Sequence, residues 1–391
     1  MKRVLTVIVV LSMSLLGVGL SSAPSFAGVG EALACGATIS TNTTLNHDLV
    51  NCPDNGLVVG ADNITLDLNG HTIDGDGVLS DCPPENVDMC DLGVNNTAGH
   101  HGITVRGGSI SDFTHGVLDE GSHNVMRGLS VSNSFGSGIA LLNAQNDRVT
   151  GSFLHDNGLT QDAQGIVVAF GSGNQFDANL ASNNGDAGIA TFASNDNRVT
   201  GNSVVGNRFA GVVMGEGTGN QATGNHIAGS PTGVIIDGDN SVVSGNQMTV
   251  PVGCGPDGCN FGISFEGGNG TLLANNVIIG AQYGIRVDAF AGETHGTQIR
   301  GNMVSASGAD GIAVDLEQPG PVPDTLVVGN SVIGAGVDGI RVNSASTTLT
   351  RNIANHNGNL GIEAVVGVID GGGNHAAGNG NPLQCTNIKC S

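Results

Sequence analysis

The sequence predicts an all-β fold, a single-stranded parallel β-helix (solenoid) of roughly twelve or thirteen coils. One sequence unit recurs from residue 116 onward, at an average spacing of about 24 or 25 residues. Each unit begins with Gly, continues with aliphatic residues at alternate positions, and ends in a polar stretch, with no helical periodicity. The opening glycines are Gly116, Gly138, Gly165, Gly188, Gly211, Gly233, Gly262, Gly284, Gly311, Gly339 and Gly361.

The alternation within each unit predicts which side chains face inward. In the unit that opens at Gly284, we expect Ile285 and Val287 to point into the solenoid, and Arg286 and Asp288 to point outward. The core must consist of stacked Val, Ile and Leu, because aromatic residues make up only 3% of the chain. The opening Gly is expected where the backbone needs a positive φ or a close approach to a neighbour.

A second repeated feature is a Gly-Asn pair in the polar part of several units. The Asn residues of these pairs are Asn202, Asn225, Asn246, Asn302 and Asn330. They would fall at one turn of successive coils, where stacked Asn side chains hydrogen-bond from coil to coil. We therefore interpret them as structural residues and not as ligand-binding residues.

Residues 1–27 are predicted to be a secretory signal peptide. A basic start is followed by an apolar stretch from Val4 to Leu20, and Ser25-Phe26-Ala27 fits a small-x-small cleavage site. The apolar stretch is marginal for a transmembrane anchor and no positive flank follows it. We expect a secreted, extracellular protein with no membrane span after signal cleavage.

The rest of the chain is expected to form one rod with a cap at each end. Residues 28–56 are predicted to be an N-terminal leader and cap, residues 57–370 the β-helix, and residues 371–391 a disulfide-stapled C-terminal cap. Within the β-helix, residues 76–101 are expected to form a long polar insertion. Caps are needed because open end coils would expose unpaired backbone groups.

Eight cysteines in an exported chain indicate disulfide bonds. About five coils, or ~24 Å, separate the pair at 254 and 259 from the pair at 385 and 390, which is too far for cross-pairing. A zinc site is disfavoured because no His pair accompanies the C-x4-C spacings. We expect four disulfides, with other pairings open for the first four cysteines: Cys35–Cys52, Cys82–Cys90, Cys254–Cys259 and Cys385–Cys390.

The chain is strongly acidic. It has 34 acidic and 12 basic residues, and loss of Lys2 and Arg3 with the signal would change its formal charge from −22 to −24. Such a surface repels nucleic acid and anionic membranes, which excludes them as partners. If the ligand is itself anionic, a cation must mediate. We expect the protein to be a monomer.

Two stretches of the chain resemble a known family. CGATISTNTTLNHDLVNCPDNGLVVGADNITLDLNGHTIDGDG, near the start, and GGGNHAAGNGNPLQC, near the end, are similar to secreted bacterial right-handed parallel β-helix repeat proteins of the pectate-lyase-like superfamily. The resemblance covers nearly the whole mature chain and implies that the solenoid is right-handed. Relatives in this superfamily include pectate lyases, polygalacturonases, alginate lyases, mannuronan epimerases and NosD-like periplasmic proteins.

The active-site motifs of those relatives are missing from this sequence. It has no DPHD stretch like that of the epimerases, no R-x-P-x-x-R like that of pectate lyases, and no N-T-D with G-D-D and G-H-G like that of polygalacturonases. No catalytic residue can be carried over, and likeness of fold alone gives no function.

The outward positions of the later units carry a column of acidic residues. Like charges on adjacent strands, ~4.8 Å apart, repel one another, so something must offset the repulsion. The same positions in the earlier units are mostly apolar. Four residues after each opening Gly lie Asp237, Glu266, Asp288, Asp315 and Asn343, and two residues after it lie Arg286, Arg341 and Glu363.

Three explanations for this column are open. Calcium could be held by Glu266, Asp288 and Asp315, because Ca²⁺ takes several carboxylate oxygens. One acid could have the raised pKa that a general acid requires. The favoured explanation is ion pairing with Arg286 and Arg341.

These observations favour a protein that binds an extracellular polysaccharide along this face, with lyase or epimerase chemistry as an extension. The alternative is a non-catalytic surface or structural β-helix protein. A more distant one is a NosD-like periplasmic protein that handles a metal such as copper, although no Met/His cluster supports it. The candidate catalytic residues are Asp288, Asp315, Arg286 and Arg341, and the candidate substrate-binding residues are Asp237, Glu266, Asn343 and Glu363.

Overall fold

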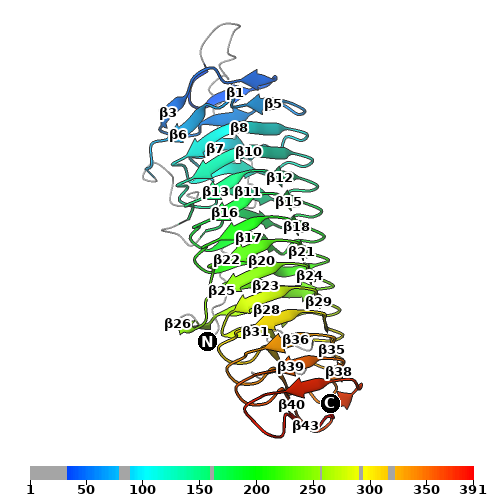
Figure 1. The fold of residues 1–391 in the computed structure, drawn as a ribbon. Helices are drawn as coiled ribbons and strands as arrows, with labels where there is room; N and C mark the ends of the chain where they lie inside the picture. The colour runs from blue at the N-terminus through cyan, green and yellow to red at the C-terminus, as the bar shows by residue number, and fades with distance from the viewer. Residues whose placement is uncertain (1–32, 79–88, 159–162, 256–257, 290–293, 316–321) are drawn as a thin grey trace.

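The computed structural model describes residues 33–78, 89–158, 163–255, 258–289, 294–315 and 322–391. These residues form one elongated rod of stacked coils, with the first coils at one end and the last coils at the other (Figure 1). The predicted signal peptide, residues 1–27, lies outside the described residues. The described part of the chain contains β-strands and no α-helix. It therefore has no helix that is long and apolar enough to cross a membrane.

The first sheet, sheet A, takes one strand from each coil, and all neighbouring strands in it are parallel. It has fifteen strands. They are β1 (Ala37–Ile39), β4 (Leu57–Val59), β7 (Leu92–Asn96), β9 (His115–Asp119), β11 (Ile139–Leu142), β14 (Ile166–Ala169), β17 (Ala187–Phe192), β20 (Ala210–Thr218), β23 (Thr232–Asp239), β28 (Phe261–Gly267), β31 (Tyr283–Val287), β34 (Ile312–Val314), β37 (Ile340–Val342), β40 (Ile362–Ala364) and β43 (Cys385–Thr386).

The remaining parallel strands form sheet B, which runs along the rod as two columns joined through the long strands β8 (Thr104–Ser111) and β10 (Val125–Ser132). The first column also contains β2 (Thr43–Thr44), β5 (Thr65–Asp67), β12 (Arg148–Thr150), β15 (Gln175–Asp177), β18 (Arg198–Thr200), β21 (Gln221–Thr223), β24 (Val242–Ser244), β29 (Leu272–Ala274), β32 (Gln298–Arg300), β35 (Leu326–Val328), β38 (Thr348–Thr350) and β41 (Ile369–Asp370). The second column also contains β3 (Leu49–Cys52), β6 (Thr72–Gly75), β13 (Phe153–His155), β16 (Leu180–Ser182), β19 (Ser203–Val205), β22 (His226–Ala228), β25 (Gln247–Val250), β30 (Val277–Gly280), β33 (Met303–Ser305), β36 (Ser331–Ile333), β39 (Ile353–Asn355) and β42 (His375–Ala377).

The rod is longer than the predicted twelve or thirteen coils, because segments expected to be caps and an insertion take part in it. β1 lies within the predicted leader, residues 28–56, and pairs with β4. β7 lies within the predicted insertion, residues 76–101, and pairs with β4 and β9. β43 lies within the predicted C-terminal cap and pairs with β40. Gly36 lies just before β1 and Gly93 lies within β7, much as in the regular units, but Gly93 lies 37 residues after Gly56 and β43 follows no Gly, so these segments did not fit the period of about 24 or 25 residues.

Inside the rod, aliphatic side chains stack from coil to coil. Ile285 and Val287 are completely buried in one continuous core, as the alternation predicts. The opening glycines have negative φ, so glycine is not required there by the backbone conformation. It is required because the neighbouring coil and side chains lie too close for a Cβ atom. A Cβ at Gly211 would meet the Ile227 side chain and lie 2.7 Å from the carbonyl oxygen of Gly233 in the next coil.

The Gly-Asn pairs form the predicted coil-to-coil ladder. In each step, the Asn Nδ2 donates to the Oδ1 of the next Asn at 2.9 to 3.1 Å, and the backbone N–H of the same Asn donates to that oxygen as well. All members are buried: Asn179, Asn202, Asn225, Asn246, Asn276, Asn302, Asn330, Asn352 and Asn374. The structural interpretation of these residues is therefore confirmed.

Three of the four expected disulfides are confirmed: Cys35–Cys52, Cys254–Cys259 and Cys385–Cys390, with Cα–Cα distances of 5.4, 3.8 and 6.2 Å. Cys90 is also disulfide-bonded, and Cys82 lies outside the described residues. Cys254 and Cys259 close the small antiparallel hairpin of β26 (Cys254–Gly255) and β27 (Gly258–Cys259), which precedes β28. Disulfides of this number point to an exported protein.

Two buried carboxyl groups, those of Asp119 and Asp147, belong to a second ladder of hydrogen bonds, which continues through Asn174 and Asn197. Asp147 occupies a ladder position, because its carboxylate accepts the backbone N–H of Asn124 at 2.9 Å and its own N–H donates to Asn174 at 2.9 Å. Asp119 accepts hydrogen bonds from Asn96 and Asn124. Burial, followed by the neighbouring Asp119 carboxyl, raises the pKa of Asp147 to about 8.

We predict that Asn246→Ala lowers the free energy of unfolding by roughly 2–4 kcal/mol, since each buried group left without a partner costs about 1–3 kcal/mol. The variant removes donors to Ala222 and Asn276 and the acceptor of Asn225. Chemical denaturation followed by circular dichroism measures the effect. Gln247→Ala, at the adjacent exposed position, is the control and should leave the midpoint almost unchanged.

We predict that Asp147→Asn removes a loss of stability between pH 4 and 8. Below pH 4 the carboxyl is protonated in both states. As the pH rises toward 8, the unfolded chain loses this proton while the folded protein keeps it, so stability falls by up to about 1.4 kcal/mol per pH unit. Unfolding midpoints measured across this range should decline for the parent and stay flatter for the variant. Parallel declines would contradict the assignment.

Candidate functional site

The outward face of sheet A changes character along the rod, as predicted. Apolar side chains form two small clusters before the C-terminal half: Leu92, Leu118 and Ala140 on the N-terminal strands, and Ala187, Ala190, Ala210, Val213 and Ile235 on the middle strands. In its C-terminal half, the same positions carry charged and aromatic residues. We call this C-terminal half, from β28 to β40, the polar face.

The acidic column lies on the polar face, with one break in register. Val287 pairs with Phe265 on one side and with Val314 on the other, so the residues that follow them, Glu266, Asp288 and Asp315, occupy equivalent positions on three coils. Asn343 follows in the same way after Val342. Asp237 departs from the prediction because a β-bulge shifts the register, and it pairs with Gly267 instead of Glu266.

A buried ion pair lies at the centre of the column. The Arg286 guanidinium contacts the Asp288 carboxylate, and only 9% of Arg286 and none of Asp288 is exposed. The Arg286 guanidinium also lies 4.9 Å from the ring centroid of Phe261. Phe261 stacks on Tyr283 with ring centroids 5.9 Å apart, and Tyr283 is the only tyrosine of the chain.

A second charged group surrounds Arg341. Its guanidinium lies 3.3 Å from the Glu363 carboxylate and 4.0 Å from the Asp310 carboxylate. Asp310 accepts the backbone N–H of Asp338 at 3.0 Å, and Asp338 accepts the N–H of Leu360 at 2.8 Å. Both arginines are therefore paired with acids, in agreement with the favoured explanation of the acidic column.

Phe261, Tyr283, Asp310 and Asp338 were not among the predicted site residues. Each immediately precedes an opening Gly, and so lies outside the stretch after the Gly to which the alternation was applied. Their shared position, one residue before Gly262, Gly284, Gly311 and Gly339, is the sequence signal that identifies them.

Burial shifts several acids on and beside this face toward their neutral form. Burial, followed by repulsion from Asp288, raises the pKa of Asp315. Burial is also the main cause that raises the pKa of Glu266, Asp237 and Asp310. Two of the three explanations of the acidic column therefore apply at the same time: ion pairing with arginine, and raised pKa values.

Asp315 has the most unusual environment of the group. It lies just after β34 in a left-handed backbone conformation (φ 60°), and only 7% of the residue is exposed. Its N–H donates to the carbonyl oxygen of Val287 at 2.8 Å, and its buried Oδ1 has no hydrogen-bond partner in the described part of the chain. A buried carboxyl oxygen of this kind is expensive to leave unpaired.

The calcium hypothesis remains a prediction. Among the described residues, no group of three or more His, Cys, Asp or Glu side chains is arranged to hold a metal ion. Residues 290–293 and 316–321, which belong to the loops next to Asp288 and Asp315, lie outside the described residues.

Two family models match parts of the chain. The model described as right handed beta helix region matches residues 92–248, and the model described as periplasmic copper-binding protein (NosD) matches residues 211–379. Each covers less than half of the chain, and together they agree with the predicted right-handed parallel β-helix and its NosD-like resemblance. No curated protein matches the sequence.

Solved structures with the same fold are distant in sequence. The tailspike protein of E. coli bacteriophage HK620, solved in complex with a pentasaccharide, is similar with a TM-score of 0.56 and 13% identity, over 90% of this chain and 69% of the tailspike. The catalytic unit of the alpha-1,3-glucanase of Streptomyces thermodiastaticus is similar with a TM-score of 0.51 and 14% identity, over 89% of this chain and 63% of the glucanase. The periplasmic alginate epimerase AlgG is similar with a TM-score of 0.45 and 14% identity, over 74% of this chain and 73% of the epimerase. At these identities the likeness to the tailspike and the glucanase establishes the fold only.

We predict that Arg286→Gln lowers the free energy of unfolding by about 3–5 kcal/mol, because it leaves the buried Asp288 carboxylate without its counter-charge. The double variant Arg286→Gln/Asp288→Asn should recover most of that loss. Denaturant unfolding of the two variants and the parent measures both effects. Equal losses for the single and double variants would show that the ion pair is not what stabilises this coil.

Proposed function

We propose that this protein is exported to the cell exterior and binds a polysaccharide along the polar face. The observation that carries the proposal is the stacked pair Phe261 and Tyr283 beside the Arg286–Asp288 ion pair. Flat aromatic rings take the apolar faces of sugars, and fixed charged groups next to them bind hydroxyl groups. A chain with so few aromatic residues places two of them together at this point.

The arrangement along the rod suits a linear polymer. Neighbouring coils present Phe261 with Glu266, then Tyr283, and then the group around Arg341, so aromatic and polar groups recur along the rod at multiples of the coil spacing of ~4.8 Å. The side chains come from paired parallel strands, which hold them rigidly. Support also comes from the shared fold of the tailspike that was solved with a pentasaccharide.

A catalytic extension of this function is favoured by one observation, the environment of Asp315. A buried carboxyl group with a raised pKa and a free oxygen has the properties of a general acid. Hydrolysis or another acid-assisted reaction on the bound polymer fits this group better than an elimination with Arg286 as base. An ion-paired guanidinium donates hydrogen bonds and does not accept a proton. The non-catalytic alternative leaves Asp315 as a structural acid.

A copper-handling function fits the residues poorly, despite the partial match to the NosD family model. Copper sites need a cluster of His, Cys or Met ligands. In the regions that the structure describes, several histidines instead lie beside a single carboxylate, as in His71–Asp48, His100–Asp62 and His155–Asp156.

We predict that the double variant Phe261→Ala/Tyr283→Ala binds its polysaccharide at least about tenfold more weakly than the parent, equivalent to ~1.4 kcal/mol. Binding of alginate, polygalacturonate and α-1,3-glucan to the mature protein by calorimetry identifies the polymer, with and without added Ca²⁺. Phe170→Ala, which removes an exposed aromatic residue after β14, is the matched control and should retain full affinity. Undiminished binding by the double variant would reject the polar face as the binding site.

The catalytic extension has its own test. If Asp315 is a general acid, Asp315→Asn should abolish release of reducing ends from the bound polymer while binding stays within about threefold of the parent. The parent's rate should fall as the pH rises through the raised pKa of Asp315, because only the protonated carboxyl can donate. Absence of any product with the parent on every polymer that it binds would establish the non-catalytic alternative.

A further inference from the structure

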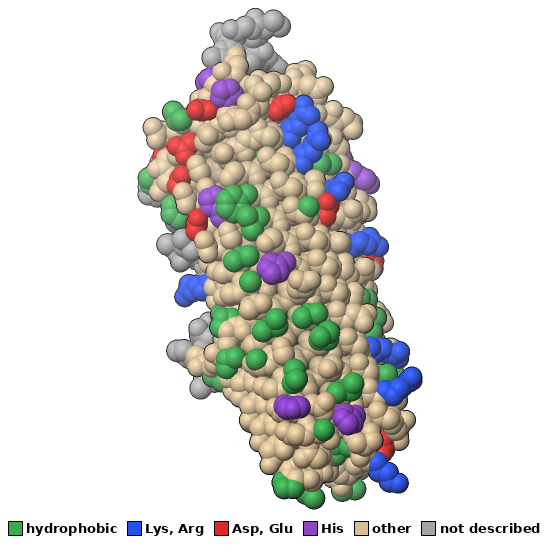
Figure 2. Space-filling model, in the orientation of Figure 1, with side chains coloured by type: hydrophobic (Ala, Val, Ile, Leu, Met, Phe, Trp, Pro, Cys, Tyr) green, Lys and Arg blue, Asp and Glu red, His purple; other side chains and the backbone are tan. Residues whose placement is uncertain are grey.

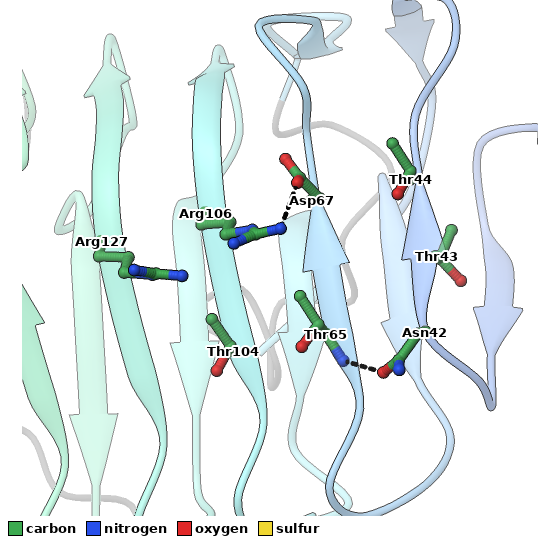
Figure 3. A pocket seen from close by; sticks show the side chains of 8 residues that line it. All are labelled: Asn42, Thr43, Thr44, Thr65, Asp67, Thr104, Arg106 and Arg127. Atoms are coloured by element: carbon green, nitrogen blue, oxygen red, sulfur yellow. Dashed lines mark hydrogen bonds and ion pairs between the residues drawn. The ribbon is translucent and has the colours of Figure 1, made fainter.

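A second surface with the chemistry of a binding site lies on the N-terminal coils, on sheet B. A depression of about 260 Å³ is formed there by strands β2, β5, β8 and β10. Figure 3 shows Arg106 and Arg127 side by side on neighbouring strands, with threonines and Asn42 around them. On the face that Figure 2 shows, Lys and Arg side chains gather into a cluster near this end of the rod.

The two arginines belong to one column of register partners. Asp67, Arg106 and Arg127 occupy equivalent positions on three consecutive coils, followed by Thr150 and Asp177. Such neighbours are ~4.8 Å apart along the rod. A guanidinium therefore has its nearest charged neighbours in the coils before and after it.

The column leaves positive charge without a counter-charge. Arg106 binds Asp67 at 2.7 Å, and Arg148, from the coil after Arg127, binds Asp177 at 2.7 and 2.8 Å. Arg127 is exposed and has no ion pair or side-chain hydrogen bond within the described ranges. In a chain with 34 acidic and 12 basic residues, an unpaired arginine beside a second arginine is unexpected.

A second observation concerns Arg106. Its side chain is 41% exposed, and among the described residues it pairs with one carboxylate, that of Asp67. Its Nε has no hydrogen-bond partner in the described part of the chain. Thr65 and Thr104 add hydroxyl groups to the same depression. A bound anion would accept hydrogen bonds from both guanidinium groups and offset their repulsion.

A second, shallow groove begins next to the depression and extends over β8, β10, β13 and β16. This second hollow, of about 460 Å³, is bounded by Gly108, two residues after Arg106 in β8, by Gly128, which directly follows Arg127 in β10, and by the partly exposed side chains of Phe153 and Leu180. A Cβ added at Gly128 or Gly151 would meet nothing within 4 Å, so glycine at these positions keeps the groove open. The apolar side chains of Phe153 and Leu180, next to exposed glycine backbone, leave space for a sugar ring to pack against them.

We propose that these two hollows together bind an acidic saccharide, with its carboxylate on Arg127 and Arg106 and its sugar rings over the glycine floor against Phe153. The site is on a different sheet from the polar face and does not depend on the function proposed above. It gives an acidic protein a place where an anionic sugar binds directly, without a bridging cation.

The test is calorimetry of the mature protein with trimers of galacturonate, glucuronate and mannuronate. At least one trimer should bind, and its carboxyl methyl ester, which has the same rings without charge, should bind at least about tenfold more weakly. Arg127→Gln should weaken the acidic trimer about tenfold and remove much of the salt dependence of binding. Phe153→Ala should weaken it as well.

Arg300→Gln is the matched control. Arg300 is exposed and occupies the same column as Arg127, seven coils further along the rod, so its loss should have no effect. The Phe261→Ala/Tyr283→Ala variant should also bind the trimer normally, which separates this site from the polar face. The proposal is overturned if no trimer binds, if Arg127→Gln behaves like Arg300→Gln, or if inorganic sulfate alone binds as tightly as the trimer.

Discussion

The structure depends on one constraint, the in-register hydrogen bonding of each coil to the next. Parallel ladders satisfy the backbone groups of every coil, and the buried Asn ladders do the same for the turns. Once register is set, every position in the repeat becomes a column along the rod. Core, turn and surface residues are therefore each arranged in columns along the rod. A substitution at one position changes the contacts of the equivalent residues on the two neighbouring coils.

This constraint makes charge difficult to place, because any acidic position that repeats brings carboxylates within about one strand spacing of each other. The polar face meets the problem in three ways. Arg286 and Arg341 supply counter-charge, burial raises the pKa of Asp315, and the bulge at Glu266 moves Asp237 out of line. Asp147 shows the same conflict inside the rod, where a carboxyl replaces an Asn of the ladder and responds with a raised pKa.

Sequence alone predicted whatever follows from period and alternation. The parallel β-helix, the inward Ile285, the outward Arg286 and Asp288, and the Asn ladder all follow from local rules that repeat. Features that break the repeat could not be predicted in this way. The bulge displaced Asp237. Asp310 and Tyr283 lie one residue before the stretch that the alternation covers, and the spacing of 37 residues between Gly56 and Gly93 hid β7 from the period. Which acid pairs with each arginine depends on side-chain conformations, and the repeat pattern of the sequence carries no information about these.

The two proposed sites differ in sign of charge, and that difference determines which ligand each can take. The polar face carries more acids than arginines, so it repels an anionic polymer and accepts a neutral one, or an acidic one only with a cation between them. The two hollows on the N-terminal coils have an excess of positive charge at Arg127, and they attract a carboxylate directly. A polymer that alternates neutral and acidic sugars could not satisfy both surfaces with the same units, since each surface selects a different unit by charge. Specificity in this protein would then come from where along the rod, and on which sheet, a sugar is held.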